Sequence, residues 1–449
     1  GLLRLAELQE AAGRGDEAVQ LLEQTIALAP TPIESRGEHE KLAQLHVRQR
    51  HWQQAVDVLR KLADLFPAGN ERATVEIRVA TIYREGFSDP RAAVEALLRA
   101  LRSDPLSMEA LGKLMPLADA GHVLPIELEE KLERAIDEAR GQALAAPLAV
   151  DPYTSLTRLW GWRGDDDARL IAAQAEALMG GRAAPVREHG NEPLKELSAA
   201  AWDRIWPETA RSVALEIWRA VGEATWTVYG PTLESLNVGK RERVNAKGTP
   251  LAWIPVDKIA RALLGTQRAY ELYASPRVDT CVAAGEALVM GSMFADKLTA
   301  AARFRAARRI ALMRERLGPV EALDADEVAL FFAACARVAE LPRPPSLPPM
   351  NESRVEDRAR VLGRAIARKD RKALQSIGAR MASLPSPGEW RDAVLQGAAR
   401  AALAVSGDLP SALAELQLDL GRDKLAQTLT LFAVSDDFRV LRREMGLKG

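Results

Sequence analysis

Apolar residues recur with a helical period over the first 140 residues of the chain, and each recurring run stops at a proline. The apolar positions follow the spacing i, i+3, i+4 and i+7, which places them on one face of an α-helix. The runs stop at Pro30, Pro67 and Pro105, which lie 37 and 38 residues apart. Because proline lacks an amide hydrogen and clashes with the preceding turn, each of these residues is expected to end a helix. The pattern therefore predicts repeated units of two helices joined by tight turns.

Small side chains stand where the two helices of each unit would cross. The second helices carry a small residue at Ala18, Ala55 and Ala93. The first helices carry a large residue followed by a small one, at Leu42–Ala43, Val79–Ala80 and Leu111–Gly112. This arrangement resembles the tetratricopeptide repeat family over residues 1–140. The resemblance implies a right-handed array of helical hairpins with a groove that binds an extended peptide or a partner helix.

A fourth unit begins near Ser107 and departs from the pattern. Pro116 falls inside its first helix, and a long turn precedes Pro125. Since a proline inside a helix removes one backbone hydrogen bond, we expect a distorted or terminating repeat here.

The resemblance also implies which side chains of the first helices line the groove. They are Gln44, Arg48, Ile77, Thr81, Arg84 and Lys113. The lysine and asparagine clamp with which some members of the family hold a C-terminal carboxylate is absent from the sequence. The alternative is that these polar residues only solvate a helix face.

The chain beyond the repeats divides into four predicted segments. Residues 141–198 are expected to form an irregular helical connector, and residues 199–340 a small α+β domain. Residues 341–353 contain five prolines and are expected to be an extended linker. Residues 354–449 return to the pattern of helical hairpins. The predicted fold class is mainly α, with a helical-hairpin repeat array and a small α+β middle domain.

The strands of the middle domain are expected in three short β-prone segments. These segments are residues 225–229, 269–273 and 286–290. Seven of the nine tryptophans lie between Trp160 and Trp253, which favours a packed domain there rather than a further repeat.

Residues 299–318 predict a helix that carries six arginines and one glutamate. Arg305, Arg308 and Arg309 fall near one side of this helix, where guanidinium groups would dock an acidic partner or a phosphate. The alternative is a solvated face whose arginines pair with acidic neighbours such as Glu321 and Asp324.

The segments before this helix also resemble, weakly, the core of gluzincin-type metallopeptidases. A β-prone segment, 275–277, and an apolar segment that ends at 288–291 precede a helix as in that family. The family's helix carries the zinc-binding sequence His-Glu-x-x-His, but here the corresponding turn, 307–311, reads Ala-Arg-Arg-Ile-Ala. The resemblance therefore implies a pseudoenzyme, of the kind found in some large bacterial repeat proteins.

Composition narrows the function classes further. Lys and Arg number 61 against 62 for Asp and Glu, and this balance argues against a protein that coats nucleic acid or a membrane surface. Two cysteines are too few for a disulfide framework, which favours the cytoplasm. No apolar run is long enough to span a membrane. The chain begins without Met, in what reads as a helix, so we expect it to be part of a longer chain or a complex.

No residue pattern predicts a cofactor, a metal or a catalytic centre. Glu188, His189 and Glu192 offer a single histidine in a loop, which is a poor metal site. The leading hypothesis is a non-enzymatic scaffold or adaptor that binds a protein partner through its helical repeats. The alternative is an enzyme-derived domain that binds or senses a small ligand after losing zinc peptidase activity.

Overall fold

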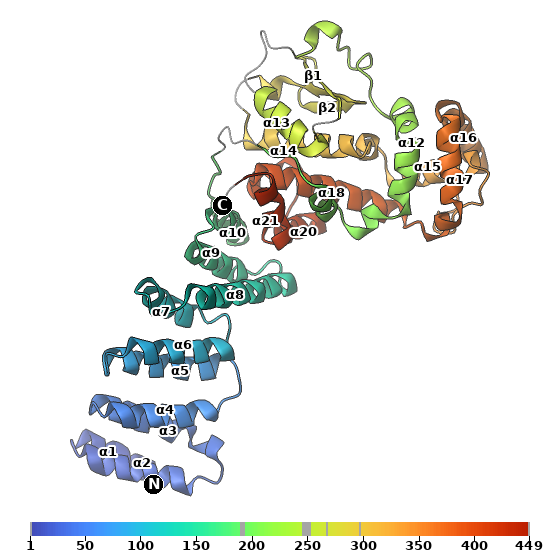
Figure 1. The fold of residues 1–449 in the computed structure, drawn as a ribbon. Coiled ribbons are helices and arrows are strands. Elements are labelled where there is room, and N and C mark those ends of the chain that lie inside the picture. Colours follow the sequence, from blue (N-terminus) through green and yellow to red (C-terminus); the bar gives the residue numbers. More distant parts are fainter. Residues whose placement is uncertain (1, 189–193, 245–252, 266–267, 296–297, 448–449) are drawn as a thin grey trace. The chain divides into compact units, whose positions relative to one another are not determined.

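The chain forms two compact units in a computed structural model (Figure 1). The structure describes residues 2–188, 194–244, 253–265, 268–295 and 298–447. The first unit comprises residues 1–145 and 151–165, and the second comprises residues 146–150 and 166–449. Among the described residues the secondary structure is mainly α-helical, with one small sheet, which confirms the predicted fold class.

The first unit consists of nine helices among its described residues. They are α1 (Leu2–Ala11), α2 (Gly15–Leu28), α3 (Arg36–Arg48), α4 (Trp52–Asp64), α5 (Asn70–Glu85), α6 (Pro90–Ser103), α7 (Met108–Asp119), α8 (Pro125–Ala145) and α9 (Asp151–Arg163). Consecutive helices pack as antiparallel pairs, α1 with α2, α3 with α4, and α5 with α6. The pairs are the helical hairpins that the apolar period predicts.

The prolines and small residues act in the repeats as expected. Helices α2, α4 and α6 end two or three residues before Pro30, Pro67 and Pro105. Ala55 and Ala93 are at most 1% exposed, so the paired helices approach closely at these positions. Burial of these faces removes apolar surface from water, which is the main source of stability in such an array.

The fourth unit keeps its first helix intact despite the internal proline. Pro116 lies within α7, and the backbone continues as helix to Asp119. The helix that follows, α8, has 21 residues and packs against α9. Trp160 of α9 is buried, with the guanidinium groups of Arg140 and Arg163 lying 5.5 and 5.4 Å from its ring centre.

The second unit contains twelve described helices and three strands. The helices are α10 (Asp166–Met179), α11 (Ala199–Ile205), α12 (Val213–Tyr229), α13 (Trp253–Leu264), α14 (Ala300–Arg314), α15 (Ala325–Val338), α16 (Glu352–Ala365), α17 (Arg368–Ile377), α18 (Pro387–Ser406), α19 (Leu409–Glu415), α20 (Lys424–Ala433) and α21 (Asp436–Glu444). The strands are β1 (Glu271–Ala274), β2 (Cys281–Ala284) and β3 (Ala287–Met290).

The sheet has the strand order β1-β3-β2, and α14 packs against β2. Strand β3 pairs in parallel with β1 and antiparallel with β2. Strands β2 and β3 are joined by a tight turn in which Gly285 has a φ of +64°, a conformation that glycine adopts without a steric cost. The predicted strands at 269–273 and 286–290 are therefore confirmed, with shifted ends.

The predicted strand at 225–229 is wrong, because these residues form the last turn of α12. Thr225, Val228 and Tyr229 have high β-propensity, but the apolar positions of the whole segment follow the helical period. Ile217, Trp218 and Val221 are all buried on one face of α12. This tertiary packing outweighs the local preference of the last five residues.

An aromatic cluster forms the core of the second unit. The ring centre of Trp218 lies 4.5 Å from that of Phe331 and 5.5 Å from that of Trp390, and Phe332 lies 5.3 Å from Trp390. These side chains come from α12, α15 and α18. Because α14 also packs along α18, residues 199–340 and 354–449 share one core and one compact unit (Figure 1).

The proline-rich segment 341–353 differs in part from the extended linker that its composition predicts. Residues 341–351 contain no helix or strand, but the amide of Leu347 donates to the carbonyl of Pro344 and closes a turn. Pro344 and Leu347 are buried, whereas Pro345 and Ser346 are exposed. The burial of these two apolar side chains thus holds the segment against the second unit.

No described helix combines the length and the apolar character that crossing a membrane requires.

Candidate functional site

The first helices of successive repeats are linked by ion pairs that run from one helix to the next. Lys41 of α3 pairs with Glu7 of α1, and Arg48 of α3 pairs with Glu10 of α1. Arg78 of α5 continues the series, with its Nη1 atom 3.0 Å from Oε1 of Glu40 on α3. Each cation lies one repeat after its carboxylate, so these pairs join neighbouring repeats.

The series of inter-repeat pairs does not include Arg84 of α5 or Lys113 of α7. Arg84 pairs with its own neighbour Glu85 at 2.8 Å, and Lys113 pairs with Glu109 of the same helix at 3.7 Å. Both carboxylates are largely exposed, with 63% and 62% of their side-chain surface accessible. Exposed pairs of this kind contribute about 0–1 kcal/mol, so the two cations are available to a further carboxylate.

Arg84 and Lys113 border one shallow depression on the repeat face. Its lining comprises Ala80, Thr81, Arg84, Ala93, Leu97, Lys113 and Leu117, from α5, α6 and α7. The alanines and leucines of the lining are buried side chains of the repeat core. The structure thus brings together three of the residues that the sequence predicts for the groove, Thr81, Arg84 and Lys113, around an apolar floor.

The other predicted groove residues lie elsewhere on the repeats. Gln44 is exposed on α3, and Arg48 is exposed but paired with Glu10. Ile77 is only 4% exposed, because it packs in the repeat core rather than on an open face. Thr81, which does line the depression, donates its hydroxyl hydrogen to the carbonyl of Ile77 in the same helix.

The arginine-rich helix is α14, and it lies inside the second unit between the sheet and α18. Arg308 and Arg309 both pair with Glu321, and Arg305 pairs with Glu415 of α19. Each of these three side chains is less than a third exposed. Burial lowers the pKa of Arg308 and of Arg309 to about 10, well above neutral pH, so both stay charged. The geometry is that of arginines paired with acidic neighbours.

The turn that would carry the zinc ligands in a metallopeptidase is also internal. Ala307, Ile310 and Ala311 of α14 are fully buried. Among the described residues, no three His, Cys, Asp or Glu side chains gather closely enough to hold a metal ion. His189 and Glu192, considered above as metal ligands, lie outside the described residues.

Two segments of the first unit match models of a known family. Residues 2–33 and 40–68 match models described as tetratricopeptide repeat. The first unit therefore contains tetratricopeptide repeats. The matched segments cover the pairs α1–α2 and α3–α4, so the repeats begin where the apolar period predicts them. The resemblance of residues 199–340 to a gluzincin core stays a prediction from the sequence.

Two solved structures are among those similar to the chain. A crystal structure of MamA is 18% identical, with 38% of this chain and 90% of that chain covered and a TM-score of 0.23. A crystal structure of a Podosopora anserina putative kinesin light chain with nearly identical TPR-like repeats is 17% identical, covers 40% of this chain and 93% of its own length, and has a TM-score of 0.24. No curated protein matches the chain.

Proposed function

We propose that the chain is a protein-interaction scaffold whose first unit binds an acidic segment of a protein partner. The observation that carries the proposal is the way in which Arg84 and Lys113 are each paired with a carboxylate. Both cations pair only with exposed carboxylates of their own helices among the described residues, and both border a depression with an apolar floor. A tetratricopeptide array supplies the extended surface on which such a segment would lie.

Binding would proceed by exchange of carboxylates. A partner's Asp or Glu side chains replace Glu85 and Glu109 beside the two cations. Because the pairs that are broken are weak and exposed, the exchange costs little free energy, and the new pairs with the partner's carboxylates favour the complex. The affinity should therefore fall as the salt concentration rises, since salt screens exposed charges.

The proposal extends to the class and location of the protein. The partner is a protein rather than nucleic acid, because cations and carboxylates alternate along the repeat face. The scaffold is not an enzyme, and zinc-dependent peptide cleavage by the purified chain would contradict this. A cytoplasmic location fits two buried free thiols, Cys281 and Cys335. A bacterial origin and descent from a metallopeptidase remain hypotheses from the sequence resemblance.

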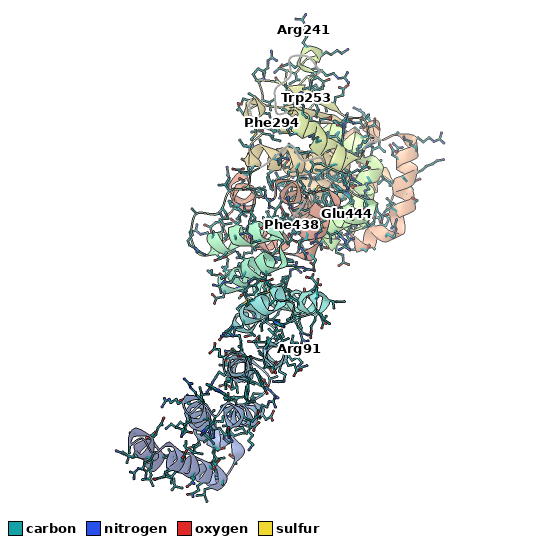
Figure 2. The ribbon with its side chains drawn as sticks, turned by 60° about the vertical axis from the view of Figure 1, so that its left-hand side comes forward. Arg91, Arg241, Trp253, Phe294, Phe438 and Glu444 are labelled. Atoms are coloured by element: carbon teal, nitrogen blue, oxygen red, sulfur yellow. The ribbon has the colours of Figure 1, made fainter. Side chains whose placement is uncertain are left out.

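An affinity capture with quantitative mass spectrometry tests the proposed function. The double variant Arg84→Glu with Lys113→Glu is compared with the wild type and with Arg91→Glu as control. Arg91 is exposed at the start of α6 (Figure 2) and is not one of the residues that line the depression. We expect a partner with an acidic segment that the wild type and the control capture and the double variant loses. A set of partners common to all three proteins would contradict the proposal.

The second candidate function is ligand binding by the second unit. It is favoured by a polar cleft between α12, α14 and the sheet, lined by charged side chains of both signs. Ligand binding in this cleft would use none of the residues of the repeats.

A further inference from the structure

A cleft of about 680 Å³ opens in the second unit beside the turn between β2 and β3. One side is formed by the last turns of α12 and the segment that follows it. The other side is formed by residues 268–270, just before β1, and by the end of α14. The cleft therefore lies where four segments of the unit meet, the usual setting of a small-molecule site.

Arg316 enters the cleft from the end of α14. Its φ is +58°, and the amide of Leu317 donates to the carbonyl of Leu312, a bond that closes the helix end with Arg316 in the left-handed conformation. The aliphatic part of the Arg316 side chain lies over Gly222 of α12, where a Cβ atom would come within 2.8 Å of it. The Trp218 indole donates to the Arg316 carbonyl at 2.8 Å and fixes the backbone. The lack of a side chain at Gly222 and this hydrogen bond together position Arg316 at the cleft.

Arg268 enters the same cleft from the segment before β1. Its Nη1 atom donates to the carbonyl of Arg314 at the end of α14, and its guanidinium group makes no other hydrogen bond within the described part of the chain. Burial lowers the pKa of Arg268, and the nearby charge of Arg316 lowers it further. Within the described ranges neither arginine forms an ion pair, although most arginines of α14 do. Two half-buried cations thus line one cleft without a direct ion pair, although the charges of Glu286 and Glu315 act on Arg268.

The rest of the lining has two parts, an apolar wall and an acidic rim. Trp226 is 9% exposed, and its ring is fixed between Gly230 and Gly318, where any Cβ atom would come within 2.3 Å of the ring. Leu264 and Met313 extend this wall. The carboxylates of Glu223, Glu234 and Glu286 are exposed around the cleft. Their charge repels a polyanion at the mouth, so the cleft favours a small ligand with one anionic group.

We propose that this cleft binds a small organic anion, with a carboxylate or phosphate group held between Arg268 and Arg316 and an apolar, planar body against Trp226. Guanidinium groups bind such oxyanions through paired hydrogen bonds, and two of them in a partly buried space hold one more tightly than an exposed cation would. The site goes beyond the scaffold function, because it lies in the second unit and needs no protein partner.

Isothermal titration calorimetry on the full chain tests this site with three ligands of similar size. Benzoate and phenyl phosphate carry the anion on an aromatic ring, and benzyl alcohol is the neutral control. The buffer contains neither phosphate nor carboxylate. We expect at least one of the two anions to bind about tenfold more tightly than benzyl alcohol. The tighter of the two anions identifies the natural ligand as a carboxylate or a phosphate. Equal or weaker binding of both anions relative to benzyl alcohol would overturn the proposal.

Variants then locate the binding. Arg268→Gln and Arg316→Gln should each weaken the anion by about tenfold, while Arg241→Gln should leave it unchanged. Arg241 is exposed in the same unit and lies outside the cleft (Figure 2). Thr227→Trp keeps both arginines but fills the cleft from the exposed side of α12, so it should also prevent binding. Circular dichroism melts verify that each variant is folded. Wild-type affinity in Thr227→Trp, or in both arginine variants, would refute the assignment.

Discussion

Arg442 of α21 donates two hydrogen bonds to the carboxylate of Asp167 of α10, which lies 275 residues away in the sequence. The Nε atom of Arg442 is 2.5 Å from Oδ2 of Asp167, and its Nη2 atom is 2.7 Å from Oδ1. Both side chains are buried, with 4% and 8% of their surface exposed. Arg187 donates to the same carboxylate and to the carbonyl of Gly407. This network fixes α10 to α21 within the second unit.

Asp167→Asn should therefore destabilise the second unit. The change leaves two buried guanidinium groups without their counter-charge, which typically costs about 3 kcal/mol. Differential scanning calorimetry should show a lower unfolding temperature for the second unit and an unchanged one for the repeats. Asp166→Asn is the matched control, because Asp166 is 78% exposed beside Arg169. An unchanged transition in Asp167→Asn would show that the network does not support the fold.

The lowered pKa of Asp167 predicts how the stability of the second unit depends on pH. Burial by itself raises the pKa of Asp167, but hydrogen bonds from Arg442 and Arg187 and their charges outweigh it and hold the pKa below its ordinary value. A carboxylate with a lowered pKa in the folded state stabilises fully above its unfolded pKa, about 4, and loses this effect as the pH falls through the folded value. Wild type should lose stability below about pH 4 more steeply than Asp167→Asn. Parallel acid profiles would contradict the assignment.

Gly407→Ala should disrupt the same network by displacing its arginines. The φ of Gly407 is +58°, and a Cβ atom there would lie 2.6 Å from Nη1 of Arg442 and 2.8 Å from Nε of Arg187. Gly181 has a φ of +61° with no atom within 4 Å of the added Cβ. Gly181→Ala is therefore the matched control, because it introduces the same backbone strain without a clash. We expect a loss of about 1 kcal/mol for Gly181→Ala and about 3 kcal/mol for Gly407→Ala. Chemical denaturation measures both, and equal losses would rule out the displacement of the arginines.

Glu321→Gln should destabilise the second unit rather than weaken the binding of a partner. Glu321 is the shared ion-pair partner of Arg308 and Arg309, and its side chain is 16% exposed. Loss of the carboxylate leaves two half-buried cations beside each other, at a cost of about 2 kcal/mol or more. Glu352→Gln, whose carboxylate is 63% exposed beside Arg337, should cost about 0.5 kcal/mol or less. Similar urea midpoints for the two variants would favour the docking role that the arginine pattern first suggested for α14.

The two cysteines should resist modification in the folded protein. Cys281 and Cys335 are both 0% exposed, and burial raises the pKa of Cys281 to about 12 and that of Cys335 as well. A thiol reacts as its thiolate, so neither should react with Ellman's reagent at pH 8 until the chain unfolds. Release of two thiols in guanidinium and none before it is the expected result. Fast modification in native buffer would show that the sheet or α15 opens readily.

The repeats could be predicted because their signals are local. A helical period, a proline and a small crossing residue such as Ala55 fall within one unit, and the partner helix is the next one along the chain. The end of α12 could not be predicted, because β-propensity at Thr225 and Tyr229 conflicts with packing that only the whole unit defines. The cleft was missed for a related reason. Trp226, Arg268 and Arg316 belong to three separate segments, and no spacing along the chain indicates that they meet.

The two units also differ in when their helices find their partners during synthesis. Each repeat packs consecutive helices, so a hairpin such as α5 with α6 can close soon after its second helix leaves the ribosome. In the second unit, α10 contacts α19 and α11 contacts α21, so these early helices wait for residues 409–444. At a synthesis rate of roughly 5–20 residues per second, this wait is on the order of tens of seconds. Through that interval their apolar faces lack these partners, which exposes the nascent second unit to aggregation while the repeats that precede it in the sequence can already fold.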